Sequence, residues 1–133
     1  MDLIADTSFL IGLWRGKGWA TSFAMSNQGK SLGIPWVVLG EFQHGATRAG
    51  HPQERVDEFL ALGIPMMDPS TVVPAYATLC ASIQSEPWWR EMGQNDLWIA
   101  ACALSAGLPL VTRNHRHFGK IAGLQVLALD RTV

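Results

Sequence analysis

Short apolar runs alternate with longer amphipathic stretches along the whole chain, and this alternation limits the fold more than any other feature of the sequence. The pattern is typical of a parallel β-sheet whose strands are connected by helices. Five runs are predicted as strands: residues 3–5, 32–34, 64–67, 110–112 and 125–129. Six stretches are predicted as helices: residues 8–14, 19–26, 37–47, 53–62, 70–85 and 95–106. Because no repeat or linker interrupts the pattern, we expect a single α/β domain covering residues 1–133.

Turn-forming and capping residues support several of these boundaries. Asp68 and Pro69 predict the N-cap and the first residue of a helix, and Gly107 predicts the end of the last long helix. Residues 85–93 break the helical period and are predicted as a loop.

The composition excludes several classes of protein. Apolar residues make up 48% of the chain and charged residues 16%, which favours a folded core over disorder. The longest apolar run, residues 97–104, is much shorter than the roughly 20 residues of a membrane-spanning helix. The N-terminus has no basic region before an apolar core, unlike a secretory signal. We therefore expect a cytoplasmic protein without membrane contact, in which Cys80 and Cys102 are free thiols in apolar surroundings.

Positive charge is concentrated in one segment of a chain that is nearly neutral overall. Ten Lys and Arg against eleven Asp and Glu give a formal charge of −1, which excludes surface-wide binding to polyanions. Residues 113–120 contain Arg113, Arg116, Lys120 and two histidines but no acid. Such a run is commonly a solvated helix face. The alternative is a local contact surface for phosphate groups.

Two acids of the N-terminal third lie where a functional site is expected in a parallel sheet, outside the carboxyl ends of the strands. Asp6 directly follows the strand at residues 3–5, and a helix N-cap is the alternative role for it. Glu41 lies early in an otherwise apolar helix. A carboxylate in that setting either faces solvent or is held by a cation.

Asp96 begins the most apolar helix of the chain. Because a helix that is apolar on every side belongs at the centre of a fold, Asp96 is predicted at the rim of the core. Helix capping is again the alternative, but Asn95 can cap the helix equally well and leave Asp96 free. Thr112 and Asn114 end and follow the fourth predicted strand, so we expect them at the same edge as Asp6.

Four segments together resemble the motifs of the PIN domain superfamily and, within it, of the VapC toxins of toxin–antitoxin pairs. The segments are IADTS (4–8), VLGEF (38–42), NDLWIAA (95–101) and LVTRNHRHF (110–118). They occur in the family's order over nearly the whole chain. The resemblance implies a PIN-like three-layer α/β/α sandwich around a central parallel sheet of about five strands.

The resemblance also implies a ribonuclease that depends on Mg²⁺ or Mn²⁺, with Asp6, Glu41 and Asp96 in the positions of the metal ligands. Such an ion neutralises charge on the phosphate and acidifies the water that attacks it. Asn114 stands where many family members have a fourth aspartate, and an amide holds a hard cation less strongly than a carboxylate does. Tight binding of a second ion is therefore disfavoured.

The remaining motif positions imply substrate contacts. Thr112 and Ser8 resemble positions that line the site in the family, and Thr112 and Asn114 are counted with the acids as catalytic candidates. Basic side chains beside the acids are expected to hold the RNA backbone without reading its sequence. These are Arg113, Arg116 and Lys120.

The family likeness further implies a homodimer and a VapB-like antitoxin whose C-terminal tail binds a groove, with an arginine that displaces the metal. Six Trp and five Phe are many for one small core, so Trp14, Trp19 and Trp36 are candidates for an interface. The Trp88–Trp89 pair either stacks on RNA bases or covers an edge of the core.

Other enzyme classes fit less well. A haloacid-dehalogenase-like phosphatase needs a second aspartate where this chain has Ser8, and a response-regulator receiver needs paired early acids. His115 and His117 have no further Cys or His at zinc-ligand spacing. The alternative from a different functional class is a catalytically impaired PIN-fold module that binds RNA or a protein partner. Asn114 is the feature that favours it, and the three retained acids favour an active nuclease.

Overall fold

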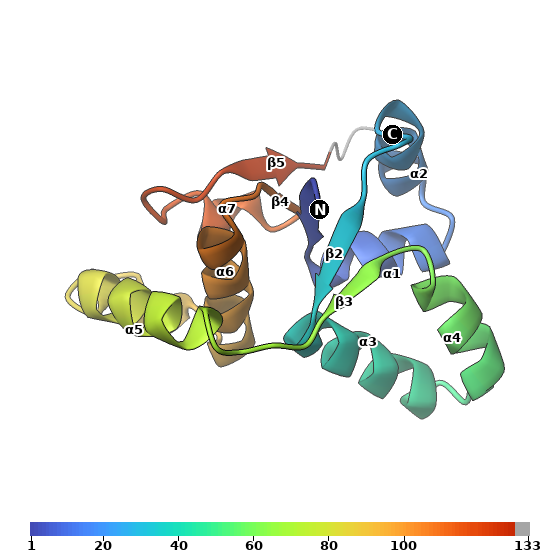
Figure 1. The fold of residues 1–133 in the computed structure, drawn as a ribbon, viewed down its shortest axis with the longest axis horizontal. Helices are drawn as coiled ribbons and strands as arrows, with labels where there is room; N and C mark the ends of the chain where they lie inside the picture. Colours follow the sequence, from blue (N-terminus) through green and yellow to red (C-terminus); the bar gives the residue numbers. More distant parts are fainter. Residues whose placement is uncertain (130–133) are drawn as a thin grey trace.

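Five short parallel strands form the centre of the computed structural model, which describes residues 1–129 (Figure 1). The strands are β1 (Leu3–Ala5), β2 (Leu32–Pro35), β3 (Ile64–Met66), β4 (Leu110–Thr112) and β5 (Val126–Ala128). Their order in the sheet is β3-β2-β1-β4-β5, and every neighbouring pair is parallel. Ala5 pairs with Val111, so the carboxyl ends of β1 and β4 lie next to each other.

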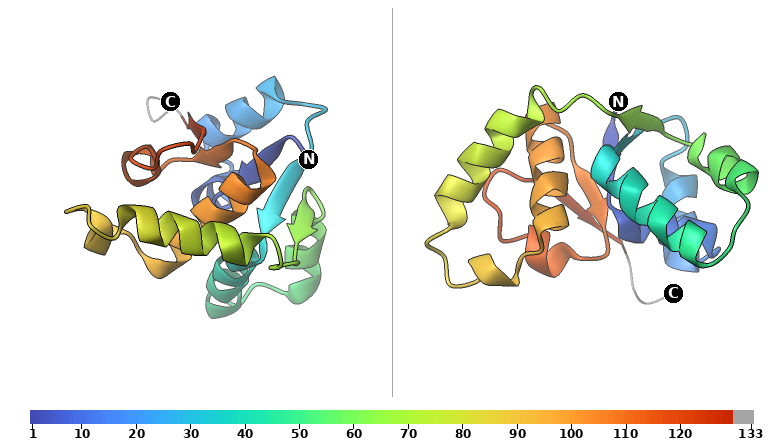
Figure 2. Two further views of the ribbon diagram at one scale, coloured as in Figure 1. Left: turned by 60° about the vertical axis from the view of Figure 1, so that its left-hand side comes forward. Right: turned by 90° about the horizontal axis from the view of Figure 1, so that it is seen from below.

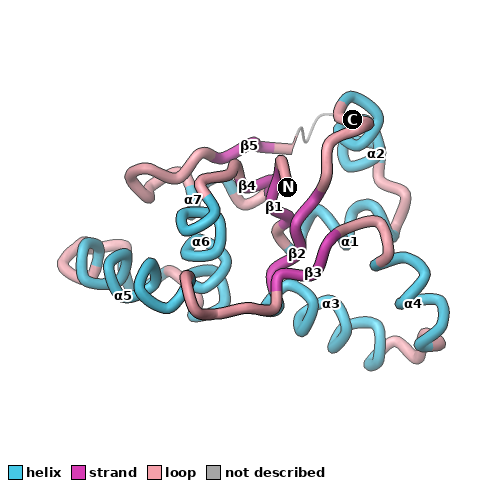
Figure 3. Tube along the Cα trace, in the orientation of Figure 1, coloured by secondary structure: helices cyan, strands magenta, loops and turns pink. Residues whose placement is uncertain are grey.

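Helices cover both faces of this sheet. They are α1 (Thr7–Trp14), α2 (Gly18–Ser26), α3 (Trp36–Arg48), α4 (Gln53–Leu60), α5 (Val72–Ile83), α6 (Gln94–Ala106) and α7 (His115–Phe118), with a 3₁₀ turn η1 (Trp89–Glu91) before α6. Figure 2 shows α5 and α6 on one side of the strands and α1 and α2 on the other. The loop after β3 carries the chain across to α5, away from the β3 edge (Figure 3). This three-layer arrangement confirms the α/β/α sandwich.

The core is centred on β1, β4 and α6. Every residue of β1 and β4 is buried, and α6 is buried along most of its length, at Leu97 and at residues 99–103. The central position predicted for this helix is confirmed. Within residues 1–129, the buried polar side chains are those of Asp6 and Thr112. Burying a polar group costs free energy unless the group is hydrogen-bonded, so polar side chains are unusual in a core. We therefore take this buried pair as the position of the candidate site.

Most predicted boundaries agree with the structure. The strands at residues 3–5 and 110–112 are confirmed to the residue, and the other predicted elements end within two residues of the observed ones. Gly107 ends α6 with a φ of 65°. Asp68 is not a helix N-cap: α5 begins at Val72, and the Asp68 carboxylate accepts the Ser70 N–H at 2.9 Å.

The sequence prediction missed two short elements. The turn η1 lies within the predicted loop, and α7 follows Asn114. Both are too short to show an apolar period. In residues 1–129, no helix combines the length and the apolar character that crossing a bilayer requires.

Candidate functional site

Asp6 is held by two hydroxyl groups at the carboxyl end of β1. Its Oδ2 accepts a hydrogen bond of 2.6 Å from Thr112 and one of 2.8 Å from Ser8. Asp6 is 5% exposed and Thr112 is fully buried. Asp6 occupies the N-cap position of α1, but its side chain makes no capping hydrogen bond. The Asp6 side chain therefore does not cap α1, although the residue holds the N-cap position, and its carboxylate remains a candidate for the site.

The same two hydroxyl groups tie the start of α1 to the turn after β4. The backbone N–H of Asn114 donates to Thr112 Oγ1 at 2.8 Å, and that of Arg113 donates to Ser8 Oγ at 3.1 Å. The two hydroxyl oxygens lie 3.4 Å apart. Positions separated by more than a hundred residues are thus fixed relative to the Asp6 carboxylate.

Glu41 reaches the site from α3. It is half-buried, and its Oε1 accepts a hydrogen bond of 2.7 Å from the Thr7 hydroxyl. The bond joins residues 34 positions apart in the chain. The Glu41 side chain is therefore held at the start of α1 and is not a freely solvated carboxylate.

Asp96 lies in the first turn of α6 and is half-buried. Burial and the negative charges of Asp6 and Glu41 raise the pKa of the Asp96 carboxyl to about 6, while positive charge on His117 acts in the opposite direction. The N-cap of α6 is Gly93, so neither Asp96 nor Asn95, the two capping alternatives, caps this helix. The repulsion indicates that Asp96 lies near enough to Asp6 and Glu41 to feel their charges.

Burial also raises the pKa of the Asp6 carboxyl, and the charge of Glu41 adds to this effect. The hydroxyl groups of Thr112 and Ser8 and the backbone N–H of Thr7 oppose the rise by bonding to the charged form. The site therefore gathers carboxylates that repel one another and that a nearby cation would stabilise.

The donor set of this site is chemically suited to Mg²⁺ or Mn²⁺, because both ions prefer carboxylate and other oxygen ligands. Among residues 1–129, no three His, Cys, Asp or Glu side chains lie close enough together to form a ready-made metal cage. Mg²⁺ keeps several of its waters when it binds a protein, so carboxylates contact it both directly and through those waters. Water-mediated contacts are therefore compatible with the absence of a ready-made cage in this part of the chain.

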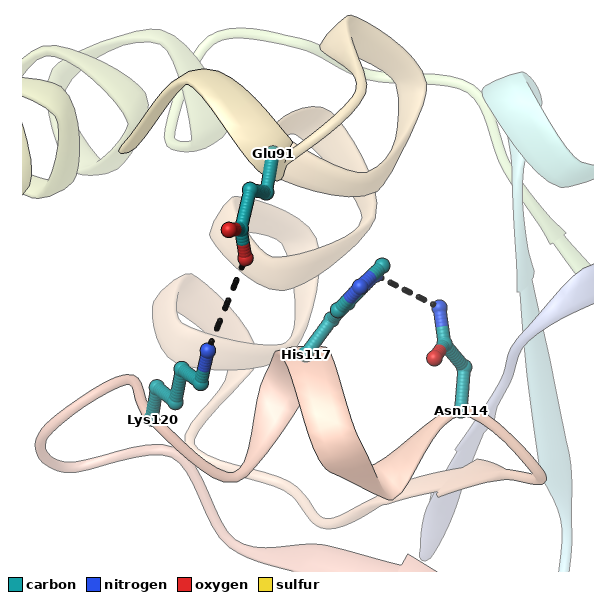
Figure 4. Close-up of polar contacts among 4 residues, drawn as sticks. All are labelled: Glu91, Asn114, His117 and Lys120. Carbon is teal, nitrogen blue, oxygen red and sulfur yellow. Dashed lines mark hydrogen bonds and ion pairs between the residues drawn. The ribbon is translucent and has the colours of Figure 1, made fainter. Parts of the chain in front are cut away.

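Asn114 and His117 form a polar pair at the start of α7 (Figure 4). The Asn114 Nδ2 lies 3.2 Å from His117 Nδ1, one turn further along α7. Sequence reasoning did not place His117 or Thr7 in the site. The spacing of three residues between Asn114 and His117 was a usable signal once a helix starts at Asn114. The Thr7 contact with Glu41 leaves no local sequence signal, because it depends on the packing of α1 against α3.

The three basic residues of the fourth motif have different surroundings. The Arg113 guanidinium lies over the Trp19 ring, 4.2 Å from its centroid, and the residue is half-buried. The Lys120 ammonium lies 3.8 Å from a Glu91 carboxylate oxygen (Figure 4). Arg116 is exposed. The three basic residues therefore do not share one environment: Arg113 packs on a tryptophan, Lys120 is paired with an acid, and Arg116 is exposed.

Glu41 lies between two hollows in the surface. The first, of about 360 Å³, lies against α1 and α3 and includes Trp14 and Phe42 in its wall. The second, of about 330 Å³, lies on the other part of α3 and includes Trp36 and Asn95. Because Glu41 lines both hollows, its carboxylate is accessible from either of them.

Comparison with known proteins identifies the family. The PIN domain family model matches residues 3–124. Ribonuclease VapC1 of Rickettsia felis is 31% identical over 98% of this chain and 98% of its own length, and Ribonuclease VapC of Rickettsia bellii is 31% identical over 97% of each.

Solved structures show the same fold at lower identity. The VapBC2 structure of Rickettsia felis bound to a promoter DNA fragment gives a TM-score of 0.82 with 21% identity, over 98% of this chain and 100% of that chain. A DNA-bound VapBC structure from Salmonella typhimurium gives 0.80 with 21% identity, over 96% and 98%. The chain therefore belongs to the PIN domain family and is a VapC-like member of it.

Proposed function

We propose that this chain is a metal-dependent endoribonuclease toxin that hydrolyses RNA phosphodiester bonds and is inhibited by a cognate antitoxin. The observation that carries the proposal is the convergence of Asp6, Glu41 and Asp96, from three separate elements, at the carboxyl end of the central strands. The names of the curated relatives, which are VapC ribonucleases, support the same activity.

Asp6, Glu41 and Asp96 are the residues that would hold a Mg²⁺ or Mn²⁺ ion. When bound, such an ion supplies positive charge for the phosphate oxygens and an acidified water as the nucleophile. The chain's own groups keep the acids in position: Thr112 and Ser8 bond Asp6, and Thr7 bonds Glu41. We infer one bound ion rather than two, because Asn114 contributes an amide in place of a fourth carboxylate.

The polar groups around the acids are proposed to orient the substrate. Ser8 and Asn114 lie at the edge where a phosphate would approach Asp6, whereas the fully buried Thr112 acts by holding the Asp6 carboxylate. Arg116 is exposed beside them and is suited to a backbone phosphate, and Arg113 and Lys120 complete the proposed contact surface. Such contacts position an RNA strand without selecting its sequence.

The test is cleavage of a structured RNA pool in Mg²⁺ or Mn²⁺, compared with chelator. We expect wild-type protein to cut the RNA and Asp6→Asn or Asp96→Asn to lose at least about a hundredfold in rate, because each removes a carboxylate that would hold the ion whose positive charge stabilises the transition state. Glu58→Gln, an exposed acid on α4, is the matched control and should retain activity.

A wild-type protein that is inactive with both ions, or acid variants that are as active as wild type, would contradict the proposal. Inactivity of the wild type combined with retained RNA binding would support the alternative, a catalytically impaired PIN-fold module.

We further propose that a VapB-like antitoxin is the partner and that the chain is a homodimer in the cytoplasm. The solved neighbours include four VapBC or toxin–antitoxin structures. The hollow between α1 and α3 has mostly apolar walls, which also include Arg15 and His51, and Glu41 is its acidic residue; this suits a peptide with apolar side chains and an arginine directed at Glu41. A cognate antitoxin tail should inhibit cleavage in competition with the metal.

For the proposed homodimer, a sizing column should give about twice the mass of one chain, and elution as a monomer would exclude the dimer.

A further inference from the structure

Three aromatic side chains form a row that leads from α5 across α6 to α3. Tyr76 stacks on Trp98 with 3.7 Å between ring centroids and 11° between planes. Trp98 in turn lies 5.9 Å from Trp36 at an angle of 57°. All three residues are half-buried, and together they cover a small cluster formed by Val72, Ala101 and Cys102. The Trp36 ring is therefore held in place by the neighbouring aromatic rings in the absence of a ligand.

Trp36 also forms part of the wall of the second hollow beside Glu41. This hollow, of about 330 Å³, is lined by Trp36, Val37, Gly40, Glu41, His44 and Asn95, and we call it the Trp36 hollow. Its walls combine an aromatic ring with an amide and an imidazole at exposed positions. Its volume is at the lower end of the range for small-molecule sites, and a flat ring with polar edges fits this chemistry.

Two residues of the Trp36 hollow connect it to the candidate acids. Glu41 lines the hollow and is held by the Thr7 hydroxyl at the start of α1, where Asp6 lies. Asn95 lines the hollow and directly precedes Asp96. A nucleotide whose phosphate lies at Glu41 would therefore have the Trp36 hollow next to it.

We propose that the Trp36 hollow is a nucleobase subsite, in which a base next to the cleaved phosphodiester of single-stranded RNA stacks on Trp36 with its edge toward Asn95 and His44. The inference rests on the proposed ribonuclease function and adds a substrate contact to it. Glu41 makes the hollow unfavourable for a second phosphate, whereas a base is uncharged. Unpaired bases are the parts of RNA that proteins bind by stacking on aromatic rings.

Gly40 allows the hollow to be filled without disturbing the fold. It lies in α3 on the wall of the hollow, and a Cβ added there would have no atom within 4 Å. Replacing a helical glycine also favours the helix. We therefore expect Gly40→Leu to fold and to occupy the space proposed for the base. Ala81→Leu, at an exposed position of α5, is the matched small-to-large control.

The probe is a short oligoribonucleotide that carries a bond the protein cuts in the structured RNA pool, with an abasic riboside placed on one side of this bond or on the other. For wild type we expect one of the two abasic positions to lower kcat/KM about tenfold, which corresponds to about 1.4 kcal/mol. Loss of base–aromatic stacking has this magnitude. We expect Gly40→Leu to cut the intact RNA about tenfold less efficiently and to show little further loss on the abasic RNA, because the base has already lost its site.

Several results would overturn the inference. Full activity of Gly40→Leu would do so, as would an abasic effect equal in size in Gly40→Leu and wild type. A change in the mass of the assembly on a sizing column, seen for Gly40→Leu but not for Ala81→Leu, would instead assign the hollow to an interface between two copies. If wild type cuts no RNA, the proposed function itself fails and the subsite falls with it.

Discussion

The position of Asp6 depends on one fully buried hydroxyl group. Thr112 donates to the Asp6 carboxylate at 2.6 Å and accepts the Asn114 N–H at 2.8 Å, so one oxygen atom connects β1, β4 and the turn before α7. A buried polar pair of this kind is costly to desolvate and adds less to stability than apolar packing of the same volume. Its place at the centre of the sheet is therefore better explained by function than by stability.

Asp96 couples the charge of the site to the stability of the fold. Its pKa is about 6 in the folded protein against the ordinary 3.8, so the folded state holds the proton more tightly than the unfolded state. Through this group, metal-free protein loses stability as the pH rises from about 4 to beyond 6. We expect Asp96→Asn to raise the free energy of unfolding at pH 7.5 in chelator by about 1–2 kcal/mol after allowance for solvent screening, measured by thermal unfolding.

The gain from Asp96→Asn should shrink as the pH falls through the ordinary pKa of 3.8 and disappear below about pH 3, where the wild-type carboxyl is largely protonated in both states. Asp57→Asn, an exposed acid on α4, provides the control and should leave the pH dependence unchanged. If Asp96→Asn is less stable than wild type at pH 7.5 without metal, repulsion among the three acids is not the dominant effect at this position.

At the scale of elements, the helix pair α1 and α2 depends on a close approach at Gly12. A Cβ at this position would lie 2.3 Å from a ring carbon of Trp19 and 2.9 Å from the Ala20 Cβ. The Trp19 ring also carries the Arg113 guanidinium, so moving it disturbs the turn after β4 as well. We expect Gly12→Ala to lower the free energy of unfolding by about 1–3 kcal/mol, measured in urea, although alanine is the better helix former.

Gly45→Ala in α3 is the matched control, because a Cβ added there meets nothing within 4 Å. It should stabilise the protein by about 0.5–1 kcal/mol. Equal changes in the two glycine variants would mean that Trp19 moves aside at no cost and that α1 and α2 are not closely packed.

The sequence was sufficient for elements whose boundaries are local. The central strands are short apolar runs that end at polar residues, and for this reason their limits could be predicted to the residue. The start of α5 could not, because Asp68 and Pro69 form a turn of their own three residues before the helix begins. The four-residue helix α7 escaped prediction because its basic and histidine residues show no apolar face.

The candidate site was predictable to a similar degree. Asp6, Asp96 and Glu41 could be selected because the carboxyl ends of parallel strands converge and because acids are rare in apolar helices. Whether each was a cap, a solvated group or a site residue was decided by contacts between distant positions, such as the bond from Thr7 to Glu41. The aromatic row from Tyr76 to Trp36 depends in the same way on how α3, α5 and α6 pack together.

At the scale of the whole molecule, the formal charge of −1 conceals a separation of charge. The charges of Asp6 and Glu41 act on Asp96, and Arg116 is exposed on α7, which follows β4. If Arg116 contacts a backbone phosphate, Arg116→Gln should weaken RNA binding at low salt and reduce the slope of log K against log salt by about 0.7, the value for one phosphate of a single strand. Filter binding of an oligoribonucleotide to the cleavage-deficient Asp96→Asn protein, repeated at several salt concentrations, measures this slope.

Arg48→Gln, which removes an exposed cation at the end of α3, is the control and should leave the slope unchanged. An unchanged slope for Arg116→Gln would show that Arg116 does not contact a backbone phosphate. RNA binding would then depend on the acids and their metal.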